Sequence, residues 1–237
     1  MIEREPEPEE LVRIYNGLFK DGDFEHHRAE FELIKSGRMP PNFYRRRLLK
    51  SVERICGGRT LVEIGGGTGA FGVMAANRGW QYTNYDISDV AVTFCRRLSL
   101  NANLFNAGSL PPLMPQSVDL IVMWEVVEHV WNLRGYLDHV RMALKPPGLF
   151  LFSTPNYLTP YYQNSNRWGP LAAPPIHVNF FTKESLETSL RMRGFRQNRI
   201  FKRRIYRPQW SLRGVAKSIR CALYLDEPET LYGTAQP

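Results

Sequence analysis

The residues best suited to chemistry begin with Glu63, an acid two positions before the glycine-rich segment Gly65–Gly69. Glycines allow positive φ angles and let a ligand come close to the backbone. The apolar run Leu61–Ile64 is strand-like and a helix-like segment follows the glycines, so the start of that helix would present unpaired N–H groups to a ligand. An acid at Glu63 suits a cationic group, such as an ammonium or a sulfonium, and would repel a pyrophosphate.

A second acid, Asp86, ends the next predicted strand, Gln81–Tyr85. The segment Gly67–Gly72 also satisfies the G-x-G-x-x-G fingerprint of dinucleotide-binding proteins, and Asp86 lies near the distance expected for a ribose-binding acid. A carboxylate on a rigid strand end can accept both ribose hydroxyls, and Ile87 beside it can pack on an adenine face. The residues alone therefore leave two cofactors open, a dinucleotide and an adenosine compound that carries a cationic group.

Acids and histidines form a third set. Glu125, Glu128 and His129 are spaced i, i+3 and i+4, so we expect them on one helical face, and His177 ends a long irregular stretch. A histidine can take the proton of an oxygen or nitrogen acceptor near neutral pH. With His177, the same set could instead hold a divalent ion such as Mg²⁺ that deprotonates a hydroxyl. We favour the metal-free base and keep Mg²⁺ as the alternative.

Together these motifs resemble the class I S-adenosylmethionine (SAM) dependent methyltransferases, most closely the ubiquinone-biosynthesis O-methyltransferase-like subgroup. The resemblance covers about residues 60–205 and the final strand. It is carried by Glu63–Gly69, Asp86, Glu125–His129, Lys145–Gly148 and His177–Thr182 in that order. It implies transfer of a methyl group from SAM to a small-molecule or carrier-bound acceptor, most often at oxygen. An NAD(P)-dependent oxidoreductase or epimerase and a non-catalytic SAM-binding domain are the alternatives.

The resemblance also implies a set of site residues. The catalytic residues would be Glu125, His129 and His177. Asn106 stands where the family usually has an acid, but its carbonyl can still accept a hydrogen bond from the adenine amino group. The cofactor-binding residues would be Glu63, Gly65, Gly66, Gly67, Thr68, Gly69, Asp86, Ile87, Asn106, Ala107 and Trp124.

The elements that must position these residues alternate between strands and helices, which predicts an α/β fold. We expect a Rossmann-like, doubly wound, seven-stranded, mostly parallel sheet with an antiparallel last strand and an N-terminal helical cap. The strands would be Thr60–Ile64, Gln81–Tyr85, Asn103–Phe105, Val118–Trp124, Leu149–Ser153, Phe195–Tyr206 and Glu229–Ala235, with Lys145–Gly148 as a turn. The helices would be Glu9–Lys20, Asp23–Ser36, Asn42–Ile55, one from the glycines to about Asn77, Val90–Leu98, Leu133–Leu144, one from Thr182 to Gly194, and Ser211–Tyr224.

The chain divides into two predicted parts. Residues 1–58 form a helical extension and residues 59–237 the SAM-binding domain. Residues 154–181 are rich in Tyr, Trp, Asn and Pro, and a loop of this length inside a compact domain is usually functional, so we expect a lid over the acceptor site.

Composition limits the class of protein further. The 237 residues are 43% hydrophobic, no apolar run reaches membrane-spanning length, and the acidic start does not resemble a signal peptide. Three isolated cysteines fit a reduced cytoplasm. The net charge is +8, and residues 191–220 hold eleven Lys or Arg and no acid. This segment is either a solvated face or a surface for an acidic partner, such as an anionic acceptor, a carrier or a membrane surface; nucleic acid is the lesser option.

Overall fold

A computed structural model describes residues 6–20, 25–38, 43–159, 175–202 and 230–237 of the chain. One seven-stranded sheet has the strand order β3-β2-β1-β4-β5-β7-β6, in which β7 is antiparallel to both of its neighbours and the other pairs are parallel. The strands are β1 Thr60–Ile64, β2 Gln81–Asp86, β3 Asn101–Leu104, β4 Val118–Trp124, β5 Leu144–Pro155, β6 Arg196–Lys202 and β7 Thr230–Gln236. The predicted fold class is confirmed.

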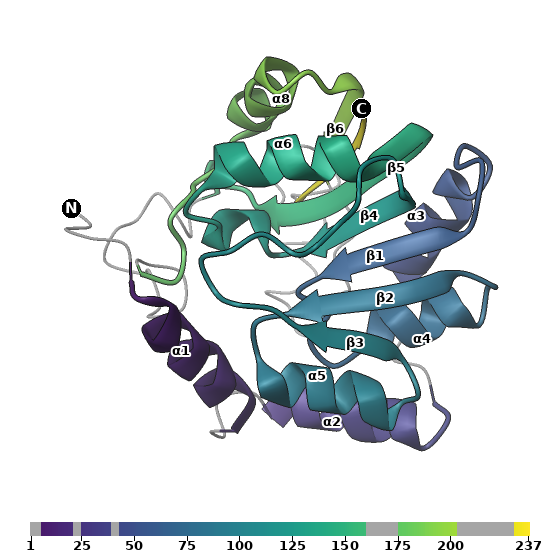
Figure 1. Cartoon of the computed structure of the whole chain (residues 1–237), viewed down its shortest axis with the longest axis vertical. Coiled ribbons are helices and arrows are strands. Elements are labelled where there is room, and N and C mark those ends of the chain that lie inside the picture. Colours follow the sequence, from purple (N-terminus) through teal and green to yellow (C-terminus); the bar gives the residue numbers. More distant parts are fainter. Residues whose placement is uncertain (1–5, 21–24, 39–42, 160–174, 203–229) are drawn as a thin grey trace, which may run out of the picture.

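Helices cover both faces of the sheet (Figure 1). Side chains of α3, α4 and α5 share a core with one face, and side chains of α6 and α8 share a core with the other. The helices are α1 Pro8–Lys20, α2 Glu25–Lys35, α3 Phe43–Val52, α4 Ala70–Ala76, α5 Asp89–Arg97, α6 Leu133–Ala143 and α8 Lys183–Met192, with a 3₁₀ turn, η2, at Val127–His129. Two helices have side-chain caps at their N-termini: Ser88 accepts a hydrogen bond from the amide of Ala91 in α5, and Thr182 forms a capping box with Ser185 in α8.

The central strand β4 is buried along its whole length, as its apolar run Leu120–Trp124 predicts for a parallel strand covered on both faces. Leu120 and Val122 pack toward α3, α4 and α5, whereas Ile121 and Met123 pack toward α6 and α8. The strand order reverses at β1, which has β2 on one side and β4 on the other. Open α/β sheets bind ligands in the crevice beyond the carboxyl ends of the strands at such a reversal.

Two strands differ from the sequence prediction. Strand β3 begins two residues earlier than expected, because Asn101–Leu104 pairs with the end of β2. The segment Lys145–Gly148 is not a turn but part of β5, which starts at Leu144 directly after α6 and pairs with Val118 of β4. The pairing of β4 with β5 shifts register between Val118 and Leu120, whose partners on β5 are Leu144 and Leu149. Residues Lys145–Gly148 lie between these two partners, within β5.

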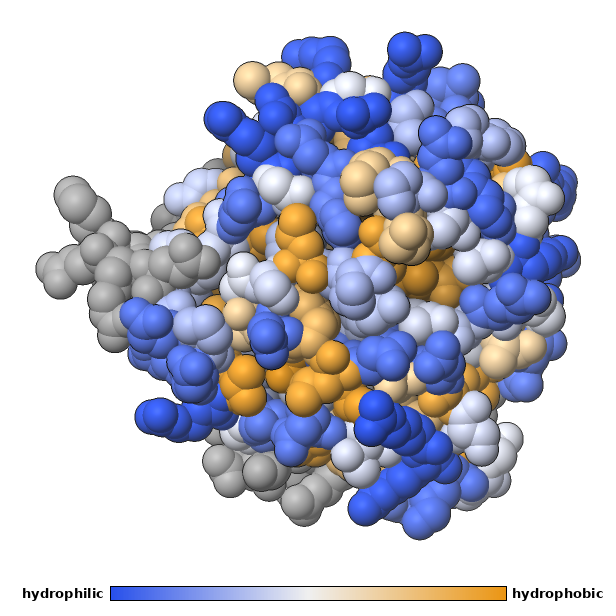
Figure 2. Space-filling view, in the orientation of Figure 1, coloured by the Kyte–Doolittle hydropathy of each residue, from blue (hydrophilic) through white to orange (hydrophobic). Residues whose placement is uncertain are grey.

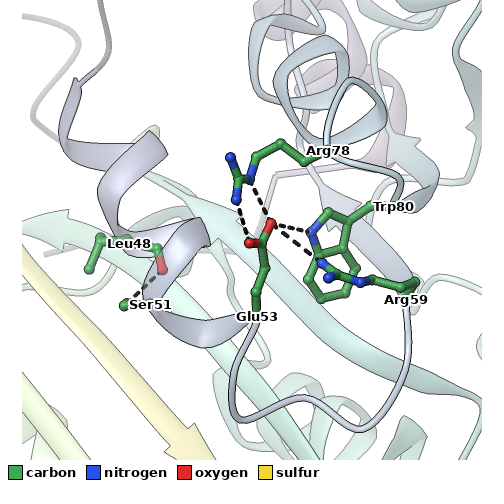
Figure 3. A network of polar contacts seen from close by, with 6 residues as sticks. All are labelled: Leu48, Ser51, Glu53, Arg59, Arg78 and Trp80. Atoms are coloured by element: carbon green, nitrogen blue, oxygen red, sulfur yellow. Dashed lines mark hydrogen bonds and ion pairs between the residues drawn. The ribbon is translucent and has the colours of Figure 1, made fainter.

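The end of α3 is tied to the sheet by a network around Glu53 (Figure 3). Its carboxylate accepts hydrogen bonds from the guanidinium of Arg78, with Nε at 2.6 Å, and from Nε1 of Trp80 at 3.3 Å. Arg59 lies 3.4 Å from the same carboxylate and stacks over the Trp80 ring. Leu48, Leu49 and Val52 of α3 also join the core of the sheet. Helix α3 is therefore fixed to the sheet that it covers.

The connection from β3 to β4 crosses the face shown in Figure 2, where apolar side chains gather near the middle of the view. Leu110 and Met114 of this connection are exposed. Within the described residues, no helix is long and apolar enough to cross a membrane. The predicted helix Ser211–Tyr224, the end of the predicted strand after Lys202, and residues 160–174 of the predicted lid lie outside the described residues.

Candidate active site

A cavity of about 430 Å³ opens at the carboxyl ends of β1, β2 and β4. Figure 1 shows α1 beside these strand ends. The loops that follow these strands form one wall, and side chains from α1, α2 and α3 form another. Most of the predicted site residues meet here: Glu63, Gly65, Gly66, Gly67, Thr68, Asp86, Ile87, Ala107, Trp124, Glu125, His129 and His177 all line the cavity.

The glycine loop between β1 and α4 is held in one conformation by its own amides. Gly65 and Gly67 have φ angles of 74° and 55°, in the left-handed region that favours glycine. The amide of Gly66 donates to Oδ1 of Asn84 at 2.9 Å, and a Cβ on Gly66 would lie only 2.6 Å from that oxygen. A side chain at Gly66 would therefore displace a buried neighbour and open the loop.

Glu63 lies at the end of β1 with its carboxylate buried against the cavity. The hydroxyl of Tyr82 donates a hydrogen bond of 2.5 Å to its Oε2. Burial raises the pKa of Glu63 to about 7, although the Tyr82 bond and the charge of Arg45 oppose the rise. A cationic ligand group placed beside this carboxylate would favour its ionised form.

Asp86 lies at the end of β2 and organises two loops. Its Oδ2 accepts from the amide of Gly67 at 3.2 Å, and its Oδ1 accepts from the amide of Ser88 at 2.9 Å. Burial raises the pKa of Asp86 to about 6, and the backbone hydrogen bonds oppose the rise. The carboxylate therefore both faces the cavity and braces the glycine loop.

His129 lies at the other end of the cavity, on the turn η2. Its Nδ1 is 2.8 Å from the carbonyl oxygen of Ile176. Because a carbonyl can only accept, Nδ1 carries the hydrogen of the neutral ring, and Nε2 keeps a lone pair. Burial lowers the pKa of His129 to about 4. The imidazole is therefore neutral, and able to accept a proton, at physiological pH.

Two further groups surround His129. The ring of His177 meets it edge-on at 4.6 Å between centroids, and burial together with His129 lowers the pKa of His177 to about 4. Oε1 of Glu128 is 3.8 Å from Nε2 of His129 and, among the described residues, has no hydrogen-bond partner. Oε2 of Glu128 accepts from Thr154 at 3.0 Å. Burial and the charge of Glu125 raise the pKa of Glu128 well above its usual range.

The expected helical face of Glu125, Glu128 and His129 does not form. Glu125 has a φ angle of 53° at the end of β4, and only the three residues of η2 after Val126 are helical. Ser153 of β5 donates a hydrogen bond of 2.6 Å to the Glu125 carboxylate and also accepts from its amide through the backbone carbonyl. These bonds hold Glu125 at the strand end, although its side chain still lines the cavity.

Two predicted cofactor residues are not part of the cavity lining. A Cβ on Gly69 would meet Leu100 and Cys95, on the side of the loop that packs against the domain. Asn106 is exposed, and its carbonyl accepts from Ser109 while Ala107 lines the cavity. A role for either residue in cofactor binding stays a prediction.

The N-terminal helices contribute side chains that the sequence reasoning missed. Arg45 of α3 places its guanidinium 4.9 Å from the centroid of the Trp124 ring, and its charge acts on Glu63 and Glu125. Glu30 of α2 accepts a hydrogen bond of 2.6 Å from Thr68. No local motif marks these positions, because in the sequence they lie in ordinary amphipathic helices far from the glycine loop.

The metal alternative has a geometric basis in part of the expected set. One ligand atom each from Glu128, His129 and His177 lie within 4.8 Å of one another. Two imidazole nitrogens and a carboxylate oxygen suit a divalent ion, and the unpartnered Oε1 of Glu128 would gain a partner from it. Glu125, the fourth expected ligand, is outside this group.

The chain is similar to known methyltransferases. A family model described as a methyltransferase domain matches residues 37–198, more than half of the chain. A probable SAM-dependent methyltransferase from Mycolicibacterium smegmatis is 30% identical over 164 residues, which cover 67% of this chain and 62% of that protein. A ubiquinone biosynthesis O-methyltransferase from Paramagnetospirillum magneticum is 30% identical over 45% of each chain. The chain thus spans about half to two thirds of these relatives.

A solved structure shows the same fold at lower identity. The structure of a SAM-dependent methyltransferase from Archaeoglobus fulgidus matches with a TM-score of 0.65 and 21% sequence identity. The match covers 94% of this chain and 100% of that one.

Proposed function

Because this chain belongs to the methyltransferase-domain family, we propose that it transfers a methyl group from SAM to an oxygen atom of a small-molecule or carrier-bound acceptor. Family membership decides between the two cofactors that the glycine loop alone allows, and it selects SAM over a dinucleotide. The acceptor and the methylated atom are the proposed part. The name of the Paramagnetospirillum magneticum relative is the comparison that favours oxygen.

The observation that carries the proposal is the lone pair on Nε2 of His129 inside the cavity that Glu63 also lines. An oxygen acceptor must lose a proton during methyl transfer, and a positioned neutral imidazole can take it. Once Nε2 is protonated, Oε1 of Glu128, 3.8 Å away, would stabilise the imidazolium by its charge or by its dipole. The pair therefore provides a proton acceptor and a second group that stabilises the protonated ring.

The other side chains have complementary proposed roles. SAM supplies an electrophilic methyl group on a cationic sulfur. Glu63 would bind a cationic group of the cofactor, Asp86 would accept from its ribose hydroxyls, and the glycine loop would contact it through the backbone. Ile87 and Ala107 would pack on the adenine, and Trp124 would border the cofactor beneath Arg45. Arg45 is suited to a carboxylate because it lines the cavity wall and its charge acts on both Glu63 and Glu125.

Acceptor activation by a divalent ion is a second proposal, supported by the proximity of Glu128, His129 and His177. An ion there would be held by these three side chains and would lower the pKa of an acceptor hydroxyl. We favour the metal-free route because Nε2 of His129 already has the lone pair that proton transfer needs.

The boundary at residue 58 and the acceptor lid also remain proposals. Pairing between Asn156 and Phe181, with the amide of Tyr157 donating to the Phe181 carbonyl at 2.8 Å, brings the two flanks of the lid segment together. Thr154 and Pro155, the first two residues of the predicted lid, belong to β5. Ile176 and His177, at its end, line the cavity, which supports a segment that borders the acceptor.

A direct assay tests the oxygen proposal. The purified protein is incubated with SAM and, separately, with 3,4-dihydroxybenzoate, ethanolamine or a 2-demethylated naphthoquinone, and the products are identified by mass spectrometry. We expect an O-methylated product from the catechol probe. Methylation of the amine or of ring carbon instead would overturn the choice of oxygen. Tight binding of S-adenosylhomocysteine (SAH) without turnover of any probe would favour a non-catalytic SAM-binding domain.

A further inference from the structure

Tyr15 of α1 lies where the two ends of the cavity meet. It lines the cavity, and its ring meets the ring of His129 edge-on, with centroids 5.7 Å apart and an interplanar angle of 89°. Burial raises the pKa of Tyr15, and the charges of Glu128 and Asp86 add to the rise. Asp86 belongs to the cofactor end of the cavity and Glu128 to the acceptor end, so the charges of both ends act on Tyr15, and its hydroxyl stays protonated.

The hydroxyl of Tyr15 differs from those of two other tyrosines, Tyr82 and Tyr136. Tyr82 donates to Glu63, and Tyr136 donates to the carbonyl oxygen of Ser109 at 3.2 Å. Within the described part of the chain, the Tyr15 hydroxyl makes no hydrogen bond. Tyr15 is half-buried and lines the cavity, so its hydroxyl is available to a ligand that enters there.

The position of Tyr15 is built into the fold. Its neighbour Asn16 accepts a hydrogen bond of 2.7 Å from the hydroxyl of Ser88. Ser88 in turn caps α5, and its amide donates to Asp86. This chain of bonds fixes α1 to the loop that carries Asp86, and it therefore sets the distance of Tyr15 from the cofactor end.

We propose that Tyr15 is a catalytic residue contributed by the N-terminal extension, whose hydroxyl donates a hydrogen bond to the acceptor atom at the point of methyl transfer. The inference rests on the proposed function. The acceptor O–H bond breaks as its proton moves to Nε2 of His129, and the freed electron pair on oxygen forms the bond to the methyl carbon. The carbon–sulfur bond breaks and its electron pair stays on sulfur, while the Tyr15 O–H bond remains intact. Contacts from Tyr15 and His129 would orient the remaining lone pair of the oxygen toward the methyl group.

Sinefungin provides a test that needs no acceptor. This analogue of SAM carries an amine where SAM carries the transferable methyl, so its amine reports on hydrogen-bonding groups at the point of transfer. We measure the dissociation constants of sinefungin and of SAH by calorimetry for the parent, Tyr15→Phe and Tyr85→Phe. Tyr85 is the matched control because it lies on β2 outside the cavity lining and packs on Phe105.

We expect Tyr15→Phe to weaken sinefungin binding about tenfold, because the charged amine loses the Tyr15 oxygen that accepts its hydrogen bond, and to leave SAH binding unchanged. Tyr85→Phe should change neither constant. Tyr15→Leu, which also removes the ring, should weaken binding of both ligands. An unchanged ratio of the two constants in Tyr15→Phe would overturn the proposal.

Turnover of the catechol probe adds a second readout. Tyr15→Phe should lower kcat about tenfold or more without raising the KM for SAM, whereas a merely structural tyrosine would change both or neither. If the parent methylates none of the probes but Tyr15→Phe still weakens sinefungin binding relative to SAH binding, the oxygen proposal fails and the position of Tyr15 stands. If the parent is active and the ratio is unchanged, only the Tyr15 proposal fails.

Discussion

The two ends of the cavity are constructed differently. At the cofactor end, Glu63, the glycine loop and Asp86 follow the neighbouring parallel strands β1 and β2, and backbone amides hold them in place. At the acceptor end, His129, His177 and Tyr15 come from three segments far apart in the sequence and meet through their side chains. A sheet edge therefore positions the first set, and tertiary packing positions the second.

Burial shifts the pKa values of the ionisable groups at the two ends of the cavity in opposite directions. It raises the pKa of Glu63 to about 7 and of Asp86 to about 6, and it lowers the pKa of His129 and of His177 to about 4. Both shifts favour the neutral form, because a charge is disfavoured away from water. We therefore expect Glu63 and Asp86 to ionise when a cation binds, whereas His129, the proposed base, is already neutral before any ligand binds.

The largest expected effect belongs to the acceptor end. His129→Ala removes the proposed proton acceptor, so kcat for the catechol probe should fall about 10²–10⁴-fold, while the dissociation constant for SAH stays within about twofold. Steady-state kinetics and calorimetry on the same preparations check both values. His139→Ala is the control, because His139 bonds the carbonyl of Pro111 and is not part of the cavity lining. A loss of SAH affinity equal to the loss of kcat would contradict the division between the two ends.

A substitution at the cofactor end should instead weaken the binding of SAH. Asp86→Ala removes a carboxylate that faces the ribose position, and each charge-assisted bond is worth about 1.5–3 kcal/mol. The dissociation constant for SAH should therefore rise at least tenfold. Because Asp86 also braces the glycine loop, circular dichroism must show an intact fold, and Asp86→Asn, which keeps an acceptor oxygen, should lose less affinity. Unchanged SAH binding in a folded Asp86→Ala variant would remove this residue from the site.

The opposite pKa shifts predict different pH dependences. Binding of cationic SAM favours the ionised forms of Glu63 and Asp86, whose pKa values are raised to about 7 and 6, so SAM affinity should increase at least fivefold from pH 5.5 to 7.5. Glu63→Gln should flatten this dependence, which calorimetry can measure. The pKa of His129, lowered to about 4, predicts that its protonation should not limit kcat over the same interval. If kcat of the parent titrates near pH 6.5 and His129→Ala abolishes that titration, His129 is not a base that is already neutral across this interval, and the prediction is wrong.

A smaller effect is expected at the basic segment. Arg196 and Arg199 are exposed on β6, and they belong to the part of residues 191–220 that the structure describes. If this surface attracts an anionic acceptor or carrier, replacing both residues by Glu should raise the KM for a carboxylated probe about two- to threefold at low salt, and less at high salt. An equal KM for the double variant and the parent at low ionic strength would leave this segment as a solvated face.

Chelation should have the smallest effect. Under the metal-free proposal, prolonged treatment with EDTA leaves kcat unchanged. Under the alternative, chelation stops turnover, a divalent ion restores it, and Glu128→Ala is as damaging as His129→Ala because both supply a ligand. Inactivation by EDTA that Mg²⁺ or Mn²⁺ reverses would replace the metal-free proposal. Metal analysis of the untreated protein provides an independent check.

Local sequence determined the elements and much of the cofactor end. The glycine loop, the acids at the ends of β1 and β2, the Ser88 cap and the Thr182 capping box depend on residues close together in the chain. Backbone conformation and hydrogen bonds between near neighbours decide such features, so a pattern of residue types predicts them. The apolar run Leu120–Trp124 of β4 likewise predicts a strand covered on both faces.

Tertiary structure alone decided the acceptor end. It placed Tyr15 against His129 and Arg45 over Trp124, moved Glu125 out of the expected helical face, and extended β5 back to Leu144. Contacts between segments far apart in the chain decide these features. The pKa shifts of the buried acids and histidines have the same origin, because they depend on how much water the surrounding elements exclude. No pattern of neighbouring residues contains that information.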